Sequence, residues 1–299
     1  MIRILVTGAN GQLGSDLRAI APQYRNIMFT FVDKRRLNIL DTEKFEQTLQ
    51  IYWPHYVINA AAYTNVEKAE DDQRTAFELN SEAVGAMAHI CKKNRVRLLH
   101  ISSDYVYHPD HDALITEDTP PKPKGIYARS KYHGELKILE SGASSLIVRT
   151  SWLYSSFGNN FVKTMLELGK TKKEVSVIHD QVGAPTYARD LAHALVQMIQ
   201  KTEAEKIKWS GQIYNYANEG AASWYDFAQL IFAKMDNSNI TVLPVSSTDY
   251  PSKVPRPKNS RLSLEKTKST WGLTIRPWQD ALDDMLAEWS KPKNKSWRP

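Results

Sequence analysis

The sequence has little cysteine, no long apolar run and no basic-plus-apolar leader. Its single cysteine, Cys91, cannot form a disulfide within the chain, which favours a reducing compartment. A membrane-spanning helix needs about 20 consecutive apolar residues. No run approaches that length, and residues 1–8 enter a predicted strand at once. We therefore expect a cytoplasmic protein that is not bound to a membrane.

A concentrated patch of one charge sign is also missing. The chain has 39 Lys and Arg against 33 Asp and Glu, a net charge of +6, but the basic residues are scattered. No aromatic residues interleave with a basic stripe, so we expect no nucleic-acid partner. A mild positive charge suits a small anionic ligand such as a nucleotide or a sugar nucleotide.

The apolar residues that are present form short runs separated by helical patterns. The runs predicted as strands, each bounded by turn residues, are 2–8, 27–33, 56–62, 97–103 and 145–152. β-Branched runs that alternate with helices are typical of βαβ units, whose parallel sheet is covered on both faces. The predicted fold is therefore α/β, with a Rossmann-type doubly wound parallel sheet.

A chain of 299 residues is long enough for about two domains. We predict an NAD(P)-binding domain at 1–155, with a helix at 187–201 packing back on it, and a smaller C-terminal substrate-binding lobe at 156–299. Within the lobe, Ser223 is an expected helix N-cap, with Asp226 completing a capping-box pattern. Pro277 suits a first helical position.

Three glycines follow the first predicted strand and open the first helix. Gly8, Gly11 and Gly14 allow a tight turn whose backbone N–H groups can bind a pyrophosphate. Asp33 ends the second strand, where a carboxylate can bond a ribose. The alternative is a glycine-rich surface turn. Asp33 favours NADH, whereas the basic residues 34–36 could accept the 2′-phosphate of NADPH, so both coenzymes stay open.

A hydroxyl, a phenol and an amine form the second chemical group. Ser103 ends the fourth strand, and Tyr127 and Lys131 are one helical turn apart. Tyr127 can act as a general acid, with a pKa that a nearby ammonium and the positive nicotinamide of an oxidised cofactor would lower, and Ser103 can bond the substrate oxygen. The alternative is ordinary helix packing and a strand-end hydroxyl.

Together, these residues resemble the extended short-chain dehydrogenase/reductase family, in which Asn80 matches a helix asparagine that helps carry the active-site water and lysine. Within that family, six more stretches resemble the dTDP-4-dehydrorhamnose reductases. These are 59–70 (NAAAYTNVEKAE), 102–107 (SSDYVY), 149–154 (RTSWLY), 158–165 (GNNFVKTM), 180–186 (DQVGAPT) and 256–262 (RPKNSRL). The resemblance implies reduction of the C4 carbonyl of dTDP-4-dehydro-L-rhamnose with NADPH or NADH.

The resemblance also implies residue roles. The expected cofactor contacts are Gly8, Gly11, Gln12, Leu13, Gly14, Asp33, Asn38, Ile39, Ala62, Tyr63, Thr64, Ile101, Tyr127 and Lys131. Ser103, Asp104 and Trp152 would bind the sugar, and Ser103, Tyr127 and Lys131 would carry catalysis. The chain departs from many relatives at Ser103 (threonine), Asn38 (aspartate) and Tyr107 (phenylalanine).

Some members of the family pair subunits through glutamates around a divalent metal. The matching positions here are Asp16, Arg189 and Glu288. Because a guanidinium has no free acceptor, we expect no metal, and the chain could be a monomer or a homodimer. Two other functions stay open. One is an epimerase, or a reductase of another nucleotide sugar. The other is a non-catalytic subunit like the regulatory β-subunit of methionine adenosyltransferase.

Overall fold

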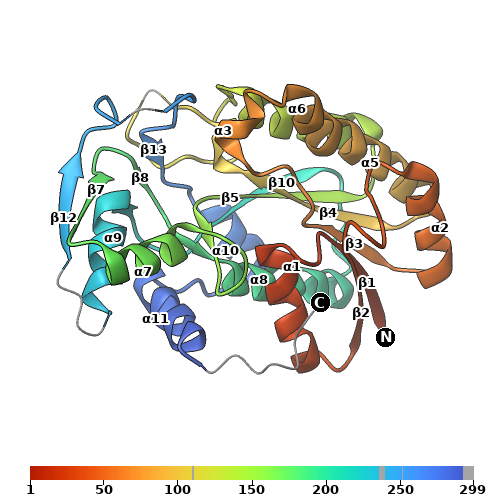
Figure 1. The fold of residues 1–299 in the computed structure, drawn as a ribbon. Coiled ribbons are helices and arrows are strands. Elements are labelled where there is room, and N and C mark those ends of the chain that lie inside the picture. Colours follow the sequence, from red (N-terminus) through yellow and green to blue (C-terminus); the bar gives the residue numbers. More distant parts are fainter. Residues whose placement is uncertain (110, 236–239, 251, 292–299) are drawn as a thin grey trace.

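The computed structural model describes residues 1–109, 111–235, 240–250 and 252–291. Within these ranges, a sheet of six parallel strands lies at the centre, in the order β10-β5-β4-β3-β1-β2 (Figure 1). The strands are β1 (Ile2–Thr7), β2 (Ile27–Val32), β3 (Tyr56–Asn59), β4 (Arg97–Ser103), β5 (Ser145–Thr150) and β10 (Gln212–Tyr216). The predicted α/β class with a Rossmann-type parallel sheet is confirmed.

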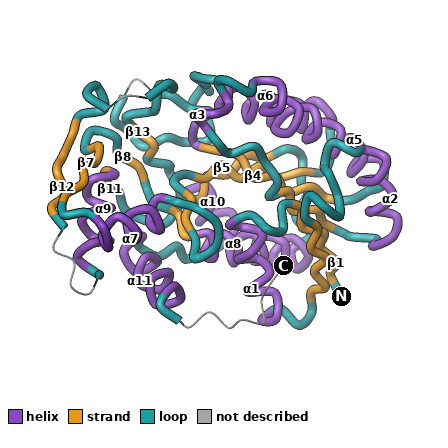
Figure 2. The backbone as a smooth tube through the Cα atoms, viewed as in Figure 1, coloured by secondary structure: helices purple, strands orange, loops and turns teal. Residues whose placement is uncertain are grey.

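Helices cover both faces of this sheet, as Figure 2 shows. The helices α1 (Gln12–Ile20) and α8 (Ala188–Glu205) pack on one face. The helices α2 (Thr42–Tyr52), α5 (Ala83–Lys93) and α6 (Ile126–Ser141) pack on the other. All six residues of β5 and all four of β3 are buried, which explains why residues 56–58 and 146–148 are continuous apolar runs rather than alternating ones.

The strand order places a crevice above the first glycine turn. The chain leaves β1 for β2 on one side and then crosses to β3 on the other side of β1. Ligands of open α/β sheets bind at such a switch point, outside the carboxyl ends of the strands. Short elements near the crevice are α3 (Val66–Ala69), a π-helical turn η2 (Glu78–Glu82) and the 3₁₀ turn η3 (Asp104–Val106). The short helix α4 (Gln73–Phe77) precedes η2, and the 3₁₀ turn η1 (Ala21–Gln23) follows α1 at the other end of that helix.

The smaller lobe has its own apolar core. Its helices are α7 (Phe161–Thr171), α9 (Trp224–Ala233) and α11 (Trp278–Trp289), which bury Phe227 and Trp278 among them. A parallel pair of strands lies at its edge, β7 (Glu174–Ile178) and β12 (Thr241–Val245). Shorter strands connect the lobe to the rest: β6 (Leu153–Tyr154), β8 (Val182–Gly183), β9 (Thr186–Tyr187), β11 (Ala222–Ser223) and β13 (Asn259–Ser260).

The sheet also receives a strand from far along the chain. Sequence analysis assigns no strand to residues 212–216, yet β10 pairs with β5 at the edge of the sheet. The helix α10 (Glu265–Trp271) packs on β10. The predicted domain boundary at residue 155 stays a prediction. The later segments α8, β10 and α10 also pack with the N-terminal sheet. Residues 292–299 of the predicted lobe lie outside the described residues.

Two predicted helix starts can be compared with the structure. Ser223 caps α9, and with Asp226 it forms the predicted capping box in both directions. Pro277 is the N-cap of α11 rather than its first helical residue. In the part of the chain that the structure describes, no helix is both long and apolar enough to span a lipid bilayer.

Candidate active site

Close backbone packing explains the glycines of the first turn. Gly8 has a φ of +66°, and a Cβ there would lie 2.6 Å from the backbone of Ala60 and Ala61. A Cβ at Gly14 would overlap the carbonyl oxygen of Gly8. Gly11 is the N-cap of α1, and it has no side chain that could accept hydrogen bonds from the N–H groups of the first helical turn. Such a helix end is an anion-binding site.

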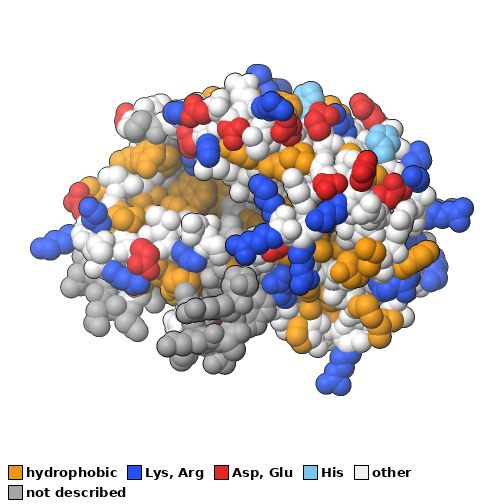
Figure 3. Space-filling model, turned by 45° about the vertical axis from the view of Figure 1, so that its right-hand side comes forward, with side chains coloured by type: hydrophobic (Ala, Val, Ile, Leu, Met, Phe, Trp, Pro, Cys, Tyr) orange, Lys and Arg blue, Asp and Glu red, His pale blue; other side chains and the backbone are white. Residues whose placement is uncertain are grey.

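A cavity of about 1190 Å³ lies at the carboxyl edge of the sheet and contains most of the predicted site. The predicted residues that line it are Gly8, Gly11, Gln12, Leu13, Asp33, Asn38, Ile39, Ala62, Thr64, Ile101, Ser103, Asp104, Tyr127, Lys131 and Trp152. Figure 3 shows the hollowed face of the molecule, with hydrophobic side chains in the hollow and Lys and Arg side chains near it.

Two residues predicted to contact the cofactor do not line the cavity. Gly14 lies inside the helix, against the backbone of Gly8 and Ala9, so its role there is close packing. The hydroxyl of Tyr63 points away to the carboxylate of Asp72, at 3.4 Å. Sequence analysis assigned no role to other lining residues, among them Asn10, Leu79, Ser102, Thr150 and Asn159, whereas Lys34 and Arg35 belong to the basic residues 34–36 that it considered for a 2′-phosphate. Ser102, Thr150 and Asn159 stand in the quoted stretches and Asn10 lies between Gly8 and Gly11, which could have indicated them.

The carboxylate of Asp33 is held by the loop that follows β2. It accepts hydrogen bonds from the backbone N–H groups of Arg35 (3.1 Å) and Arg36 (3.0 Å) and from the amide of Asn10 (2.9 Å). These bonds, above all the one from Arg36, lower the pKa of Asp33. The loop thus presents a fixed negative charge beside the cationic side chains of Lys34 and Arg35, which also line the cavity.

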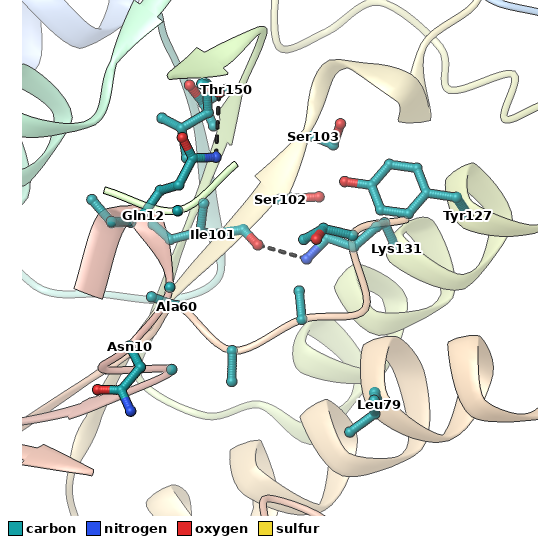
Figure 4. Close-up of a pocket in the computed structure, with 18 of the residues that line it drawn as sticks. Asn10, Gln12, Ala60, Leu79, Ile101, Ser102, Ser103, Tyr127, Lys131 and Thr150 are labelled. Carbon is teal, nitrogen blue, oxygen red and sulfur yellow. Dashed lines mark hydrogen bonds between the residues drawn. The ribbon is translucent and has the colours of Figure 1, made fainter. Parts of the chain in front are cut away.

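Ser103, Tyr127 and Lys131 come together in the cavity. The hydroxyl of Tyr127 points toward Ser103, and the amine of Lys131 points toward the end of β4 (Figure 4). Lys131 donates from Nζ to the carbonyl of Ile101 at 2.7 Å, and Ser103 donates to Asp104 Oδ1 at 3.1 Å. All three side chains are buried, so their hydrogen bonds form away from bulk water.

Burial governs the charge of these groups. It raises the pKa of Tyr127 to about 12, although a hydrogen bond with Ser103 lowers it. In the chain by itself the loss of hydration is the larger effect, and the expected lowering of the Tyr127 pKa by an ammonium and an oxidised nicotinamide stays a prediction. Burial likewise lowers the pKa of Lys131 to about 8. For Asp104, burial raises the pKa to about 6.

Asn80 connects the loop after β3 to α6. Its side chain accepts from the N–H of Tyr63 (2.8 Å) and donates to the carbonyl of Tyr63 (3.0 Å) and to Ser130 (3.0 Å). It is fully buried in the π-helical turn η2, and Gly134 of α6 allows its backbone to approach closely. Asn80 thus holds the cavity wall against the helix that carries Tyr127 and Lys131.

The smaller lobe closes the other side of the cavity with aromatic rings. Trp152 has a φ of 48° and stacks on Trp224 of α9, with ring centroids 3.6 Å apart and planes 9° apart. A Cβ at Gly183 would touch the Trp152 ring. The indole is therefore fixed by the lobe while it lines the cavity.

Asp16, Arg189 and Glu288 stand at the positions that match the family's metal ligands, and the Arg189 side chain lies between the two carboxylates. Arg189 donates to Asp16 at 3.1 Å and also forms an ion pair with Glu288. Ser155 donates to Asp16 at 2.5 Å, and Tyr187 donates to Glu288 at 2.8 Å. Among the described residues, no group of three or more His, Cys, Asp and Glu side chains could hold a metal ion.

A doubly wound parallel sheet with a glycine turn on its first helix, and with a Tyr-x-x-x-Lys helix at its carboxyl edge, defines an extended short-chain dehydrogenase/reductase. Residues 2–291 match the family model described as the RmlD substrate binding domain. This chain belongs to that family.

Individual relatives agree with this placement. The dTDP-4-dehydrorhamnose reductase of Aggregatibacter actinomycetemcomitans is 35% identical, over 96% of this chain and 99% of its own length. The spore coat polysaccharide biosynthesis protein SpsK of Bacillus subtilis is 37% identical, over 96% and 98%. A crystal structure of the Bacillus anthracis dTDP-4-dehydrorhamnose reductase with NADP is 36% identical, has a TM-score of 0.88 and covers 96% of this chain and 100% of that one. The predictions of the family and of an oxidoreductase are confirmed.

Proposed function

We propose that this protein reduces the C4 carbonyl of dTDP-4-dehydro-L-rhamnose, giving dTDP-L-rhamnose, with NADPH or NADH as the reductant. The observation that carries the proposal is that Ser103, Tyr127 and Lys131 line the same cavity as the glycine turn of α1. The names of the relatives support the substrate, and the NADP in the Bacillus anthracis structure supports the coenzyme.

The residues of the first turn fit a dinucleotide. The space at Gly8 and the N–H groups of α1 would hold the pyrophosphate, and Asp33 would bond the adenosine ribose. Asn38 and Ile39 would lie against the adenine, while Ala62, Thr64 and Ile101 would continue the binding surface toward the reacting end. When bound, the nicotinamide supplies the hydride for the carbonyl carbon.

Tyr127 is the general acid of the proposal. Its raised pKa keeps the phenol protonated at neutral pH, and its proton goes to the oxygen of the reduced carbonyl. Ser103 lies opposite the phenol and can turn its hydroxyl from Asp104 to the same oxygen (Figure 4). Lys131 lies one helical turn from Tyr127, is held by its hydrogen bond to the Ile101 carbonyl, and assists Tyr127.

Asp104 and Trp152 would hold the sugar nucleotide. Asp104 is buried beside Ser103, where a carboxyl group can bond sugar hydroxyls. Trp152, which stacks on Trp224, offers an apolar wall on the opposite side.

The charges around the adenosine ribose leave both coenzymes in the proposal. The carboxylate of Asp33 repels a 2′-phosphate, whereas the cationic side chains of Lys34 and Arg35 attract one, so the proposal includes both NADPH and NADH.

The test is the loss of nicotinamide absorbance with dTDP-4-dehydrorhamnose generated in situ, run in parallel with NADPH and NADH. The proposal expects stoichiometric coenzyme oxidation and formation of dTDP-L-rhamnose. A tightly bound, recycled NAD⁺ with no net oxidation would instead indicate an epimerase. No oxidation with any sugar nucleotide, together with co-purification of a partner enzyme, would indicate a regulatory subunit.

A further inference from the structure

A second cavity, of about 1150 Å³, lies at the opposite end of the sheet from the candidate active site. We call it the amino-edge cavity, and the side chains that matter here are those of Arg3, Trp53, His55, Lys92, Arg95 and Arg97. Ile4 pairs with Tyr56, and Tyr56 with Arg97, so the cavity lies across the amino ends of β1, β3 and β4. In Figure 1 the label N marks this edge of the sheet.

Cationic side chains dominate the lining of the amino-edge cavity. Arg3, Lys92, Arg95 and Arg97 all line it, whereas Glu203 is the only acid among the described residues of the lining. Glu203 is already paired with Arg97, at 2.7 Å, which leaves an excess of positive charge. These cations are far apart in the sequence, and the parallel pairing of the strands brings them to one edge. A hollow with this charge attracts an anion.

Some of these cations also have a structural role. The helices α2, α5 and α6 end at this edge, and a cation near a helix C-terminus interacts favourably with its carbonyl groups. Lys92 donates to the carbonyl of Ser141 at 2.8 Å, and Arg3 Nε donates to the carbonyl of Trp53 at 2.5 Å. Arg95 is exposed, and within the described residues its guanidinium has no hydrogen-bond or ion-pair partner. A structural role therefore does not account for Arg95.

Arg95 and Trp53 share a left-handed backbone conformation, with φ angles of +55° and +47°. Trp53 is the C-cap of α2, and Arg95 follows Asn94, the C-cap of α5. Glycine is the usual residue at a left-handed helix end, because a side chain costs energy there. Such outliers concentrate at functional sites. Trp152, with a φ of 48°, lines the candidate active site, but Lys206 at the end of α8 lines neither cavity, so strain supports a site only together with other observations.

The indole of Trp53 adds a second kind of recognition to the cavity. It is 71% exposed, although a tryptophan is usually buried to a large extent. Nucleic-acid bases stack on exposed aromatic rings, and phosphates bond to guanidinium groups. An exposed indole beside arginines therefore matches a ligand that joins a flat base to phosphates. We propose that the amino-edge cavity binds a nucleoside diphosphate, with its base on Trp53 and its phosphates on Arg3 and Arg95.

The strand spacing allows both arginines to reach one ligand. The strand β3 separates β1 from β4, and neighbouring strands lie about 4.8 Å apart, so the backbones at Arg3 and Arg95 are roughly 10 Å apart. Two arginine side chains can close that distance on one diphosphate. The surroundings of His55 agree with a positive potential. Burial lowers the pKa of His55, and Arg3, the N-terminal ammonium and Arg97 lower it further, against the opposite effect of Glu203.

The first test replaces the tryptophans with fluorotryptophan and follows their fluorine NMR resonances in the whole chain. Trp53 reports on the amino-edge cavity and Trp152 on the candidate active site, and Trp53→Phe and Trp152→Phe assign the two resonances. The probes are ADP, dTDP and inorganic pyrophosphate. We expect a saturable shift of the Trp53 resonance with a nucleoside diphosphate, and binding of pyrophosphate that is weaker by about tenfold or more, because it has no base to stack.

The probes also distinguish the source of the ligand. Tighter binding of dTDP would indicate a nucleotide sugar or its product, and tighter binding of ADP would indicate a purine nucleotide. A Trp53 resonance that none of the probes moves at millimolar concentration would overturn the proposal. Pyrophosphate that binds as tightly as both nucleotides would overturn it as well, since the base would then contribute nothing.

The second test separates the two cavities with Arg95→Glu. This change reverses the charge of an exposed side chain, so the Trp53 midpoint should rise by about tenfold or more while the Trp152 midpoint stays in place. Lys173→Glu is the matched control, because it makes the same change in charge at an exposed position that lines neither cavity. Equal weakening in both variants would reduce the effect to net charge and refute the site. Arg95→Gly should also lose binding, with a melting temperature no lower than that of the wild type, since glycine suits the φ of +55°.

These readouts need no turnover, so this proposal, which goes beyond the proposed function, can fail separately from it. A chain that oxidises NADPH with the sugar nucleotide but leaves the Trp53 resonance unmoved would keep the proposed function and lose the amino-edge site. A chain with the expected Trp53 shift and no coenzyme oxidation would keep the site and lose the function.

Discussion

The buried carboxyl group of Asp16 makes a specific prediction about stability and pH. Asp16 is 0% exposed, accepts from Ser155 and Arg189, and lies near Glu288. Burial raises its pKa from 3.8 to about 6. A group with a raised pKa in the folded state contributes stability that is full below its unfolded pKa and is lost as pH rises through the folded value.

The size of the effect follows from the shift. A change of about two pKa units, at about 1.4 kcal/mol per unit, corresponds to about 3 kcal/mol of unfolding free energy between pH 4 and pH 7. Asp16→Asn removes the titrating group but keeps the shape of the side chain. The unfolding free energy of the variant, relative to the wild type, should therefore increase by about 3 kcal/mol between pH 4 and pH 7.

Urea unfolding of both proteins at several pH values between 4 and 7 measures this difference, and the other titrating groups largely cancel. The loss of the Arg189 ion pair shifts the whole variant curve, so only its pH dependence is used. Ser155→Ala provides a second comparison, because the lost hydrogen bond should move the upper end of the pH window higher. If the wild-type and Asp16→Asn curves stay parallel, the carboxyl group does not titrate as described, and the argument fails.

Three other predictions concern the site and its support. Tyr127→Phe should keep coenzyme binding, measured by fluorescence titration, but lose about 10²–10⁴-fold in turnover; wild-type turnover would remove Tyr127 from the mechanism. Gly8→Ala should abolish coenzyme binding, because its Cβ would lie 2.6 Å from the Ala60 backbone at a φ of +66°; binding at wild-type strength would contradict the close packing. Glu135→Ala leaves the buried Arg149 charge unpaired and should lower the urea unfolding free energy by about 3–5 kcal/mol, most of which a further Arg149→Met should restore. An equally unstable double variant would argue against the unpaired charge as the cause.

The features that sequence analysis predicted are those set by local chain geometry. The glycine turn follows a β-branched strand directly, and the spacing of Tyr127 and Lys131 puts them on one face of a helix whatever the rest of the fold does. Strand-end positions such as Ser103 were also predictable, because the carboxyl ends of parallel strands share one edge. The structure brings all three into one cavity, where their chemical roles stay predictions.

Contacts that depend on register between distant strands were not predictable. The alignment of Asn59 with His100 is a property of the paired strands and leaves no mark in either segment alone. The strand β10 was missed for a related reason. Its sequence, QIYNY, is short and includes the polar residues Gln212 and Asn215, and its place in the sheet depends on pairing with the buried β5.

Burial is the third property that the sequence did not reveal, and at this site it decides the chemistry. The expectation of a lowered Tyr127 pKa treated Lys131 as a charge in water. Inside the protein the same loss of hydration acts against the phenolate of Tyr127 and against the ammonium of Lys131, raising the first pKa to about 12 and lowering the second to about 8. A pKa of about 8 still leaves the amine mainly protonated at neutral pH, so the protonated phenol lies one helical turn from a charged Lys131. A protonated phenol is the form that can give a proton to the oxygen of a carbonyl group that is being reduced.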